Sequence, residues 1–110
     1  MNWKPLIDTG GLEDIKQKSA VKPQAIFKHS TRCSISSMAK NRLERGVPAE
    51  NVDFNFLDLI KHRELSQKIA EEFSVDHESP QILLIKNGKC VYDESHTGIS
   101  MEEIAEQSVK

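Results

Sequence analysis

The chain has 110 residues, of which 29% are charged and 37% are hydrophobic, a composition typical of a globular protein with a well-solvated surface. This length predicts one domain, residues 1–110, and the composition disfavours both disorder and membrane spans. Fifteen Lys and Arg residues against 17 Asp and Glu give a net charge of −2. A charge so close to zero gives no strong field to attract nucleic acid or anionic lipid, so we expect neither as a partner.

The two cysteines, Cys33 and Cys90, are too few for a disulfide scaffold. The N-terminal residues lack an apolar stretch that could form the core of a secretory signal, since Glu13 and Asp14 follow closely, and we expect a cytoplasmic protein. In that reducing compartment a cysteine is either a small packing residue or a reactive thiol.

Four elements are predicted in the first half of the chain. They are a short strand at Pro5–Ile7, a helix from Thr9 or Gly10, a strand at Gln24–His29 and a helix that follows Ser34 and closes at Arg45. The last of these helices is expected to turn one apolar side inward, formed by Ile35, Met38, Ala39 and Leu43.

Five more elements follow in the second half. They are a strand at Asn51–Asp58, a helix at Arg63–Phe73, a strand at Gln81–Ile85, a strand at Lys89–Asp93 and a helix capped by Ser100. The strand at Asn51–Asp58 alternates apolar and polar residues, which predicts one buried face with Val52, Phe54 and Phe56. Asn87-Gly88 is a strong hairpin signal between the last two strands. The final helix is expected to bury Met101, Ile104, Ala105 and Val109.

The element order β-α-β-α-β-α-β-β-α defines an α/β fold. Crossover helices join parallel strands, and a terminal hairpin adds an antiparallel edge. The strands at 25–27 and 82–85 are apolar throughout rather than alternating. We therefore expect a mixed central sheet with helices on both faces.

Cys33 lies between the end of a predicted parallel strand and the next helix, at the sheet edge where ligands usually bind. Unpaired N–H groups at a helix start stabilise a thiolate, and Arg32 and Lys28 add positive charge. No acidic residue occurs between Asp14 and Glu44 to offset that charge. These features favour a thiolate at Cys33, the form required for thiol-disulfide exchange.

A packing role for Cys33 is the alternative, and its polar neighbours Thr31, Arg32, Ser34 and Ser36 argue against it. Ser36 occupies the position three residues after the cysteine, where a dithiol motif has its second sulfur. An intramolecular disulfide therefore cannot form there, and a mixed disulfide at Cys33 must be released by another thiol. Ser36 is either a hydrogen-bond donor to the thiolate or an ordinary serine on the helix surface. Cys90, within a strand, is expected to be structural.

The segment Lys28-His29-Ser30-Thr31-Arg32-Cys33-Ser34-Ile35-Ser36 resembles the monothiol bacilliredoxins, which have Lys-His-Ser, two variable residues and then Cys-Pro-Ile-Ser. The element order and length resemble thioredoxin-like proteins over essentially the whole chain. Ser34 departs from the family motif, which has proline there, and makes the helix start less rigid. In such folds a cis-proline opens the first strand of the terminal hairpin, facing the reactive cysteine. The resemblance therefore implies a cis bond at Ser79-Pro80.

The resemblance also implies a function. A bacilliredoxin removes bacillithiol from oxidised protein thiols, so the expected partners are bacillithiolated client proteins and bacillithiol itself as co-substrate, with no tightly bound cofactor. We expect a monomer. Candidate ligand-binding residues are Thr31, Ser79, Pro80, Thr97 and Gly98.

Two alternative functions remain open from the sequence. Some monothiol glutaredoxin-like proteins bind or deliver an iron-sulfur cluster shared between two protomers. A thioredoxin-like module can also bind partners without using its cysteine. The four histidines show no metal-binding spacing with either cysteine, so no metal site is predicted.

Overall fold

The computed structural model describes residues 1–110. Its elements in chain order are β1 (Trp3–Pro5), α1 (Thr9–Lys18), β2 (Gln24–His29), α2 (Ser34–Arg45), β3 (Asp53–Asp58), α3 (Arg63–Phe73), β4 (Gln81–Lys86), β5 (Lys89–Ser95), a 3-10 turn η1 (His96–Gly98) and α4 (Met101–Ser108). The predicted order of strands and helices is confirmed, and η1 is an addition.

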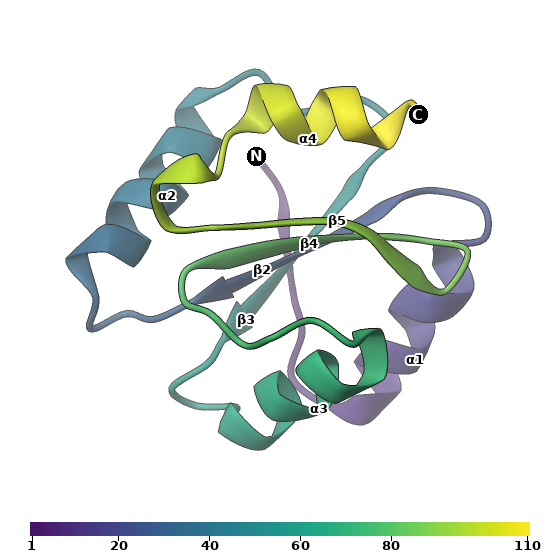
Figure 1. The fold of residues 1–110 in the computed structure, drawn as a ribbon, viewed down its shortest axis with the longest axis horizontal. Helices are drawn as coiled ribbons and strands as arrows, with labels where there is room; N and C mark the ends of the chain where they lie inside the picture. Colours follow the sequence, from purple (N-terminus) through teal and green to yellow (C-terminus); the bar gives the residue numbers. More distant parts are fainter.

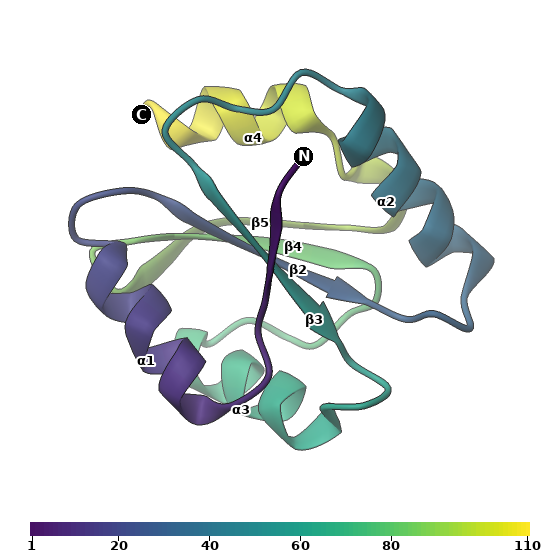
Figure 2. The ribbon, with the colours of Figure 1, turned by 180° about the vertical axis from the view of Figure 1, so that it is seen from behind.

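One five-stranded sheet runs through the molecule in the order β1-β3-β2-β4-β5. The strands β1, β3 and β2 are parallel, whereas β4 is antiparallel to β2 and β5 is antiparallel to β4. Figure 1 shows α2 and α4 on one face of this sheet and α1 and α3 on the other, and Figure 2 shows the same layers from behind. The chain therefore has the predicted thioredoxin-like arrangement, a mixed sheet covered on both faces.

Each face of the sheet has its own hydrophobic core, because successive residues of a strand point to opposite sides. In β2, Phe27 belongs to the core beneath α2 and α4, and Ile26 belongs to the core beneath α1 and α3. Every residue of β2 is buried. The apolar run in the sequence thus reflects a strand covered on both sides.

Local signals in the sequence mark several boundaries correctly. Asp8 caps α1 by accepting a hydrogen bond from the Gly11 N–H at 2.8 Å. Ser100 caps α4 by accepting from the Glu103 N–H at 3.2 Å. The hairpin turn places Asn87 and Gly88 at φ 53° and 75°, as a two-residue turn with both φ angles positive requires.

The first strand is Trp3–Pro5 rather than the predicted Pro5–Ile7. Trp3 anchors it, because its indole stacks on Phe27 with ring centroids 5.5 Å apart, and its Nε1 donates to Glu44 on α2. Ile7, expected in the strand, is 59% exposed. Aromatic packing across the sheet decides this boundary, and a short apolar run does not reveal it.

Two predicted helix faces are wrong in part. Ile35 and Met38 are exposed, because α2 packs on the sheet through Ser36, Ala39 and Leu43. The helical repeat of 3.6 residues then turns positions 35 and 38 outward. Val109 follows the end of α4 and is also exposed.

The strand β3 buries both of its faces rather than one. Leu57 is fully buried on the α1 and α3 side, and Asn55 is buried with its amide donating to the Gln24 side chain and the Ala25 carbonyl. A buried asparagine that satisfies its hydrogen bonds looks like a surface residue in a sequence. The strand β5 also continues to Ser95, beyond the predicted Asp93.

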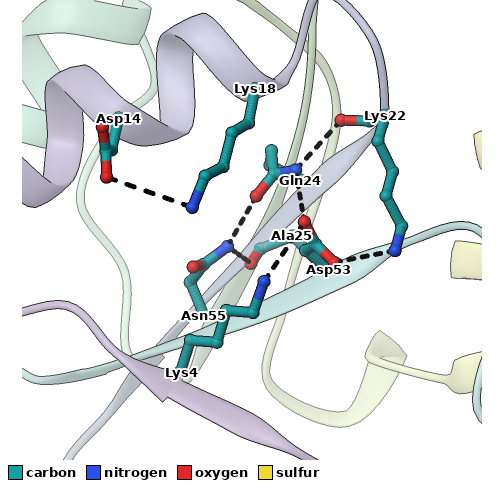
Figure 3. A network of polar contacts seen from close by, with 8 residues as sticks. All are labelled: Lys4, Asp14, Lys18, Lys22, Gln24, Ala25, Asp53 and Asn55. Carbon is teal, nitrogen blue, oxygen red and sulfur yellow. Dashed lines mark hydrogen bonds and ion pairs between the residues drawn. The ribbon is translucent and has the colours of Figure 1, made fainter.

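A polar network closes the sheet at the amino ends of β2 and β3 (Figure 3). The Asp53 carboxylate accepts from Gln24 at 2.9 Å and pairs with Lys22 at 2.9 Å and Lys4 at 3.4 Å. Burial by itself raises the pKa of Asp53, but the hydrogen bonds from Gln24 and Lys22 and the nearby lysine charges lower it to about 2.

The chain contains no helix that is long and apolar enough to span a bilayer.

Candidate active site

Cys33 is half-buried and is the N-cap residue of α2, as the sequence predicts. Its N–H donates to the Ser30 carbonyl at 3.2 Å, which closes a tight turn after β2. Its own carbonyl accepts from Ser37 at 3.1 Å and so begins the helix. The sulfur therefore lies where the first, unpaired N–H groups of a 12-residue helix create positive potential.

Ser36 holds this turn from beneath. Its side chain is fully buried, and its Oγ accepts from the Ser30 N–H at 3.0 Å and lies 2.6 Å from His29 Nδ1. The hydroxyl is bonded to the turn and to the end of β2. The structure contradicts both sequence interpretations of Ser36, since it is neither on the helix surface nor hydrogen-bonded to Cys33.

The His29 ring is buried between aromatic rings and next to a lysine. Its centroid is 5.8 Å from that of Phe27 and 5.4 Å from that of Phe56. Burial, followed by the nearby Lys40 charge, lowers the pKa of His29 below its usual value. The imidazole is therefore neutral at neutral pH, and its Nδ1 can accept a hydrogen bond from the Ser36 hydroxyl.

Lys28 does not serve the thiolate as the sequence suggested. Because it neighbours His29 in a strand, its side chain points to the opposite face, toward α3. There its Nζ donates to the Ser66 carbonyl and approaches His77 Nδ1, both at 3.2 Å. Of the two basic residues expected near Cys33, only Arg32 lies in the same turn, where it is exposed.

The Ser79-Pro80 peptide bond is cis, as predicted. Lys28 pairs with Gln81 in the sheet register, so Pro80 lies one residue further, next to the end of β2. Figure 1 shows the end of β2 and the start of β4 at the same edge of the sheet. The Ser79 hydroxyl is buried and makes no hydrogen bond.

Thr97 and Gly98 belong to η1, and α4 begins three residues later than Gly98, at Met101. Both residues therefore precede the Ser100 cap of α4, as the sequence predicts for Gly98. Arg42 of α2 fixes η1 by donating to the carbonyls of His96 at 3.2 Å and Ile99 at 3.3 Å. A Cβ at position 98 would lie 2.6 Å from Cδ of Glu94, so Glu94 packs closely over Gly98.

Cys90 lies in β5 and contacts the core on the α1 and α3 side. Its sulfur donates to the Tyr92 carbonyl at 3.3 Å, and burial raises the pKa of its thiol to about 11. Cys33 follows the end of β2, which pairs with the start of β4, whereas Cys90 pairs with Ile85 near the hairpin turn. The two cysteines therefore lie toward opposite ends of β4. The structural role predicted for Cys90 fits this environment.

The structure groups the predicted site residues into three neighbouring segments. Thr31, Arg32, Cys33 and Ser34 form the turn and helix start, Ser79 and Pro80 form the segment before β4, and Thr97 and Gly98 follow β5. His96 links the last two segments, since its N–H donates to the Pro80 carbonyl at 3.0 Å and its ring lies 3.5 Å from Glu78.

Sequence reasoning missed two residues that shape the site. Arg42 joins α2 to η1, and His77 covers Lys28. These contacts join positions that are 54 and 49 residues apart, and no local pattern signals them. His96 also has a positive φ of 57°, which no local pattern in the sequence predicts.

Comparisons with known proteins agree with this geometry. A solved structure described as a candidate oxidoreductase with a thioredoxin fold is 28% identical, with a TM-score of 0.83 over 94% of this chain and 91% of that chain. The thioredoxin of Malassezia sympodialis is 16% identical, with a TM-score of 0.80 over 99% of this chain and 92% of that chain. A thioredoxin of Fasciola hepatica is 19% identical, with a TM-score of 0.72 over 96% of both chains. The last two similarities show the fold.

A family model described as monothiol bacilliredoxin BrxC matches residues 4–104. This range includes the turn with Cys33, the segment before β4 and the segment after β5. The chain therefore belongs to the monothiol bacilliredoxin family and is a bacilliredoxin-type thiol-disulfide oxidoreductase with a thioredoxin fold.

Proposed function

We propose that this protein removes bacillithiol from mixed disulfides on other proteins, with Cys33 as the nucleophile. The observation that carries the proposal is the position of a half-buried sulfur at the start of α2, with a buried hydroxyl at Ser36 where a dithiol motif has its second sulfur. A lone thiolate of this kind can exchange with a mixed disulfide but cannot resolve it internally.

The reaction has two balanced steps. In the first, the Cys33 thiolate attacks the bacillithiol sulfur of the mixed disulfide, the client cysteine leaves as a thiolate, and bacillithiol stays on Cys33. In the second, the thiolate of another bacillithiol attacks the sulfur of the bound one. Bacillithiol disulfide forms, and the Cys33 thiolate is regenerated. Bacillithiol is thus a co-substrate, and no bound cofactor takes part.

Residues around the sulfur support these steps. Arg32 and the N–H groups at the start of α2, beginning with Ser34, stabilise the thiolate as attacking and leaving group. The backbone of Ser79, before Pro80, would pair with the cysteinyl part of bacillithiol as an added strand. Thr31 and the exposed Thr97 and Gly98 would form the rim for the rest of the ligand.

Mass spectrometry tests the proposal directly. Reduced protein is incubated with bacillithiol disulfide or with a bacillithiolated client, and its intact mass and modified peptide are measured. We expect one added bacillithiol at Cys33, and release of that adduct when free bacillithiol is supplied. The Cys33→Ala variant should gain no adduct.

The Cys90→Ala variant is the matched control and should transfer bacillithiol as the unmodified chain does. Transfer that persists in Cys33→Ala would overturn the assignment of the nucleophile. Transfer from a glutathione mixed disulfide that equals transfer from the bacillithiol one would overturn the substrate.

A further inference from the structure

Lys28 is a buried cation without an anionic partner. Its side chain has 0% exposure, and its Nζ contacts only the Ser66 carbonyl and His77 Nδ1. Burial of an ammonium group in such surroundings is costly unless its hydrogen bonds compensate. Desolvation accordingly lowers the pKa of Lys28 to about 8.

The segment that Lys28 contacts leads directly into the cis-proline. His77 precedes Ser79 by two residues and is itself exposed, so its ring lies between the buried ammonium group and solvent. On the same face, Gln81 donates from Nε2 to the Asp76 carbonyl at 3.0 Å. Lys28 and Gln81 are direct partners in the β2–β4 register. Side chains of two neighbouring strands, β2 and β4, therefore contact residues 76 and 77, at the start of the segment that leads to the cis-proline.

We propose that Lys28 is a positioning residue that acts through His77 to hold the Ser79-Pro80 segment in place for the disulfide substrate. This inference rests on the proposed function, in which that segment pairs with the ligand. The proposal gives different roles to Lys28 and His29, the two neighbouring residues at the end of β2. The His29 side chain contacts Ser36 beneath the turn that carries Cys33, whereas the Lys28 side chain contacts His77 in the segment before Pro80.

The contact with His77 depends on a neutral imidazole. Lys28 is a donor only, so His77 Nδ1 must accept, and the pKa of His77 is lowered by burial and then by the Lys28 charge. The other charged groups facing His77 are Glu78 in its own segment and Arg63 of α3, which lines the same pocket of about 170 Å³. Protonation of His77 removes the acceptor and places two positive charges 3.2 Å apart.

Four variants test the inference. Lys28→Met fills the buried space without the charge, and His77→Leu removes the acceptor at an exposed position, so both variants are expected to fold. His77→Gln keeps an acceptor that does not titrate. Lys18→Met, at an exposed lysine of α1, is the matched control for the loss of one lysine.

Steady-state kinetics with a bacillithiolated client, varied at a fixed excess of free bacillithiol, give the first readout, the KM for the client. We expect Lys28→Met and His77→Leu to raise KM about fivefold, and His77→Gln and Lys18→Met to leave KM within about twofold. The rate at which iodoacetamide alkylates Cys33 should change by less than about twofold in all four variants. Acidification below the usual imidazole range should raise KM in the unmodified chain but not in His77→Gln.

Amide hydrogen exchange of the reduced protein without substrate gives a second readout that is independent of the proposed function. We expect exchange in residues 76–81 to become about tenfold faster in Lys28→Met and His77→Leu, with β3 unchanged. Slower alkylation of Cys33 in Lys28→Met would instead assign Lys28 to the thiolate and overturn the inference. Unchanged exchange in 76–81 would overturn it as well, whereas failure of the unmodified chain to remove bacillithiol from the client would contradict only the proposed function.

Discussion

The His29 imidazole and the Ser36 hydroxyl lie 2.6 Å apart and are both buried beneath the turn that carries Cys33. Replacing Ser36 with alanine leaves His29 Nδ1 and the Ser30 N–H without this partner in a place that water reaches poorly. We expect Ser36→Ala to lower the free energy of unfolding by about 1–3 kcal/mol, the typical cost of unsatisfied buried groups. Urea unfolding at neutral pH measures this change.

Ser37 provides the control for that experiment, because it neighbours Ser36 on the same helix and is exposed. Ser37→Ala should change stability by less than about 0.5 kcal/mol. Equal effects of the two substitutions would show that the buried hydrogen bonds do not stabilise the turn.

The exposed face of α2 leads to a second prediction. Ile35→Ser and Met38→Ser should each cost less than about 0.5 kcal/mol, because these side chains already contact solvent. Leu43→Ala should cost about 2–5 kcal/mol, because Leu43 is fully buried. Thermal and urea unfolding would compare the three variants, and a large loss at Ile35 or Met38 would contradict the orientation of the helix.

Lys28 leads to a prediction about alkaline pH. Burial lowers its pKa from 10.5 to about 8 in the folded chain, so between these values the unfolded chain binds more protons than the folded one. Its contribution to stability therefore rises with pH in that window. The free energy of unfolding of Lys28→Met, relative to the unmodified chain, should fall by about 2 kcal/mol between neutral pH and pH of about 10. A constant difference across the window would mean that Lys28 keeps an ordinary pKa.

Asp53 leads to a prediction about acid pH. The pKa of Asp53 is lowered to about 2 in the folded chain, so its carboxylate stabilises the fold above pH 3.8 and loses that effect as pH falls through 2. Asp53→Asn should cost about 1–2 kcal/mol at neutral pH and almost nothing near pH 2. Urea unfolding at both pH values checks this, with Asp93→Asn at an exposed position of β5 as control. A cost that does not vary with pH would assign the effect to lost hydrogen bonds alone.

Cys90 leads to a prediction about reactivity. Burial raises the pKa of its thiol to about 11, so only a minute fraction is thiolate near neutral pH. Iodoacetamide should modify Cys33 alone in the folded chain and both cysteines in urea, as intact mass would show. Rapid modification of Cys90 in the folded chain would contradict the raised pKa of its thiol.

Much of this fold can be predicted from the sequence, because its signals are local. The apolar run in β2, the Asn87-Gly88 turn and the serine cap of α4 each act within a few residues. The position of Cys33 at the start of α2 follows from the same reasoning, since a strand, a polar turn and a helix are all readable in order.

The errors concern side chains whose partners lie far away in the sequence. Met38 was expected in the core because apolarity alone does not tell which side of a helix meets the sheet. Lys28 was expected near Cys33 because the two are close in sequence, whereas strand alternation sends the lysine to the other face. Asn55 looked exposed because its hydrogen-bond partners in β2 appear only once the sheet forms.

The alternation at the end of β2 also has a consequence for engineering. Two adjacent residues, Lys28 and His29, reach opposite sides of the sheet and support different halves of the site. In the proposed reaction, substitutions at Lys28 therefore alter ligand capture and substitutions at His29 alter the turn that carries Cys33, although the two codons are neighbours. A shift of β2 by one residue would exchange both roles at once, so this short strand sets the tolerance of the whole site to insertions and deletions.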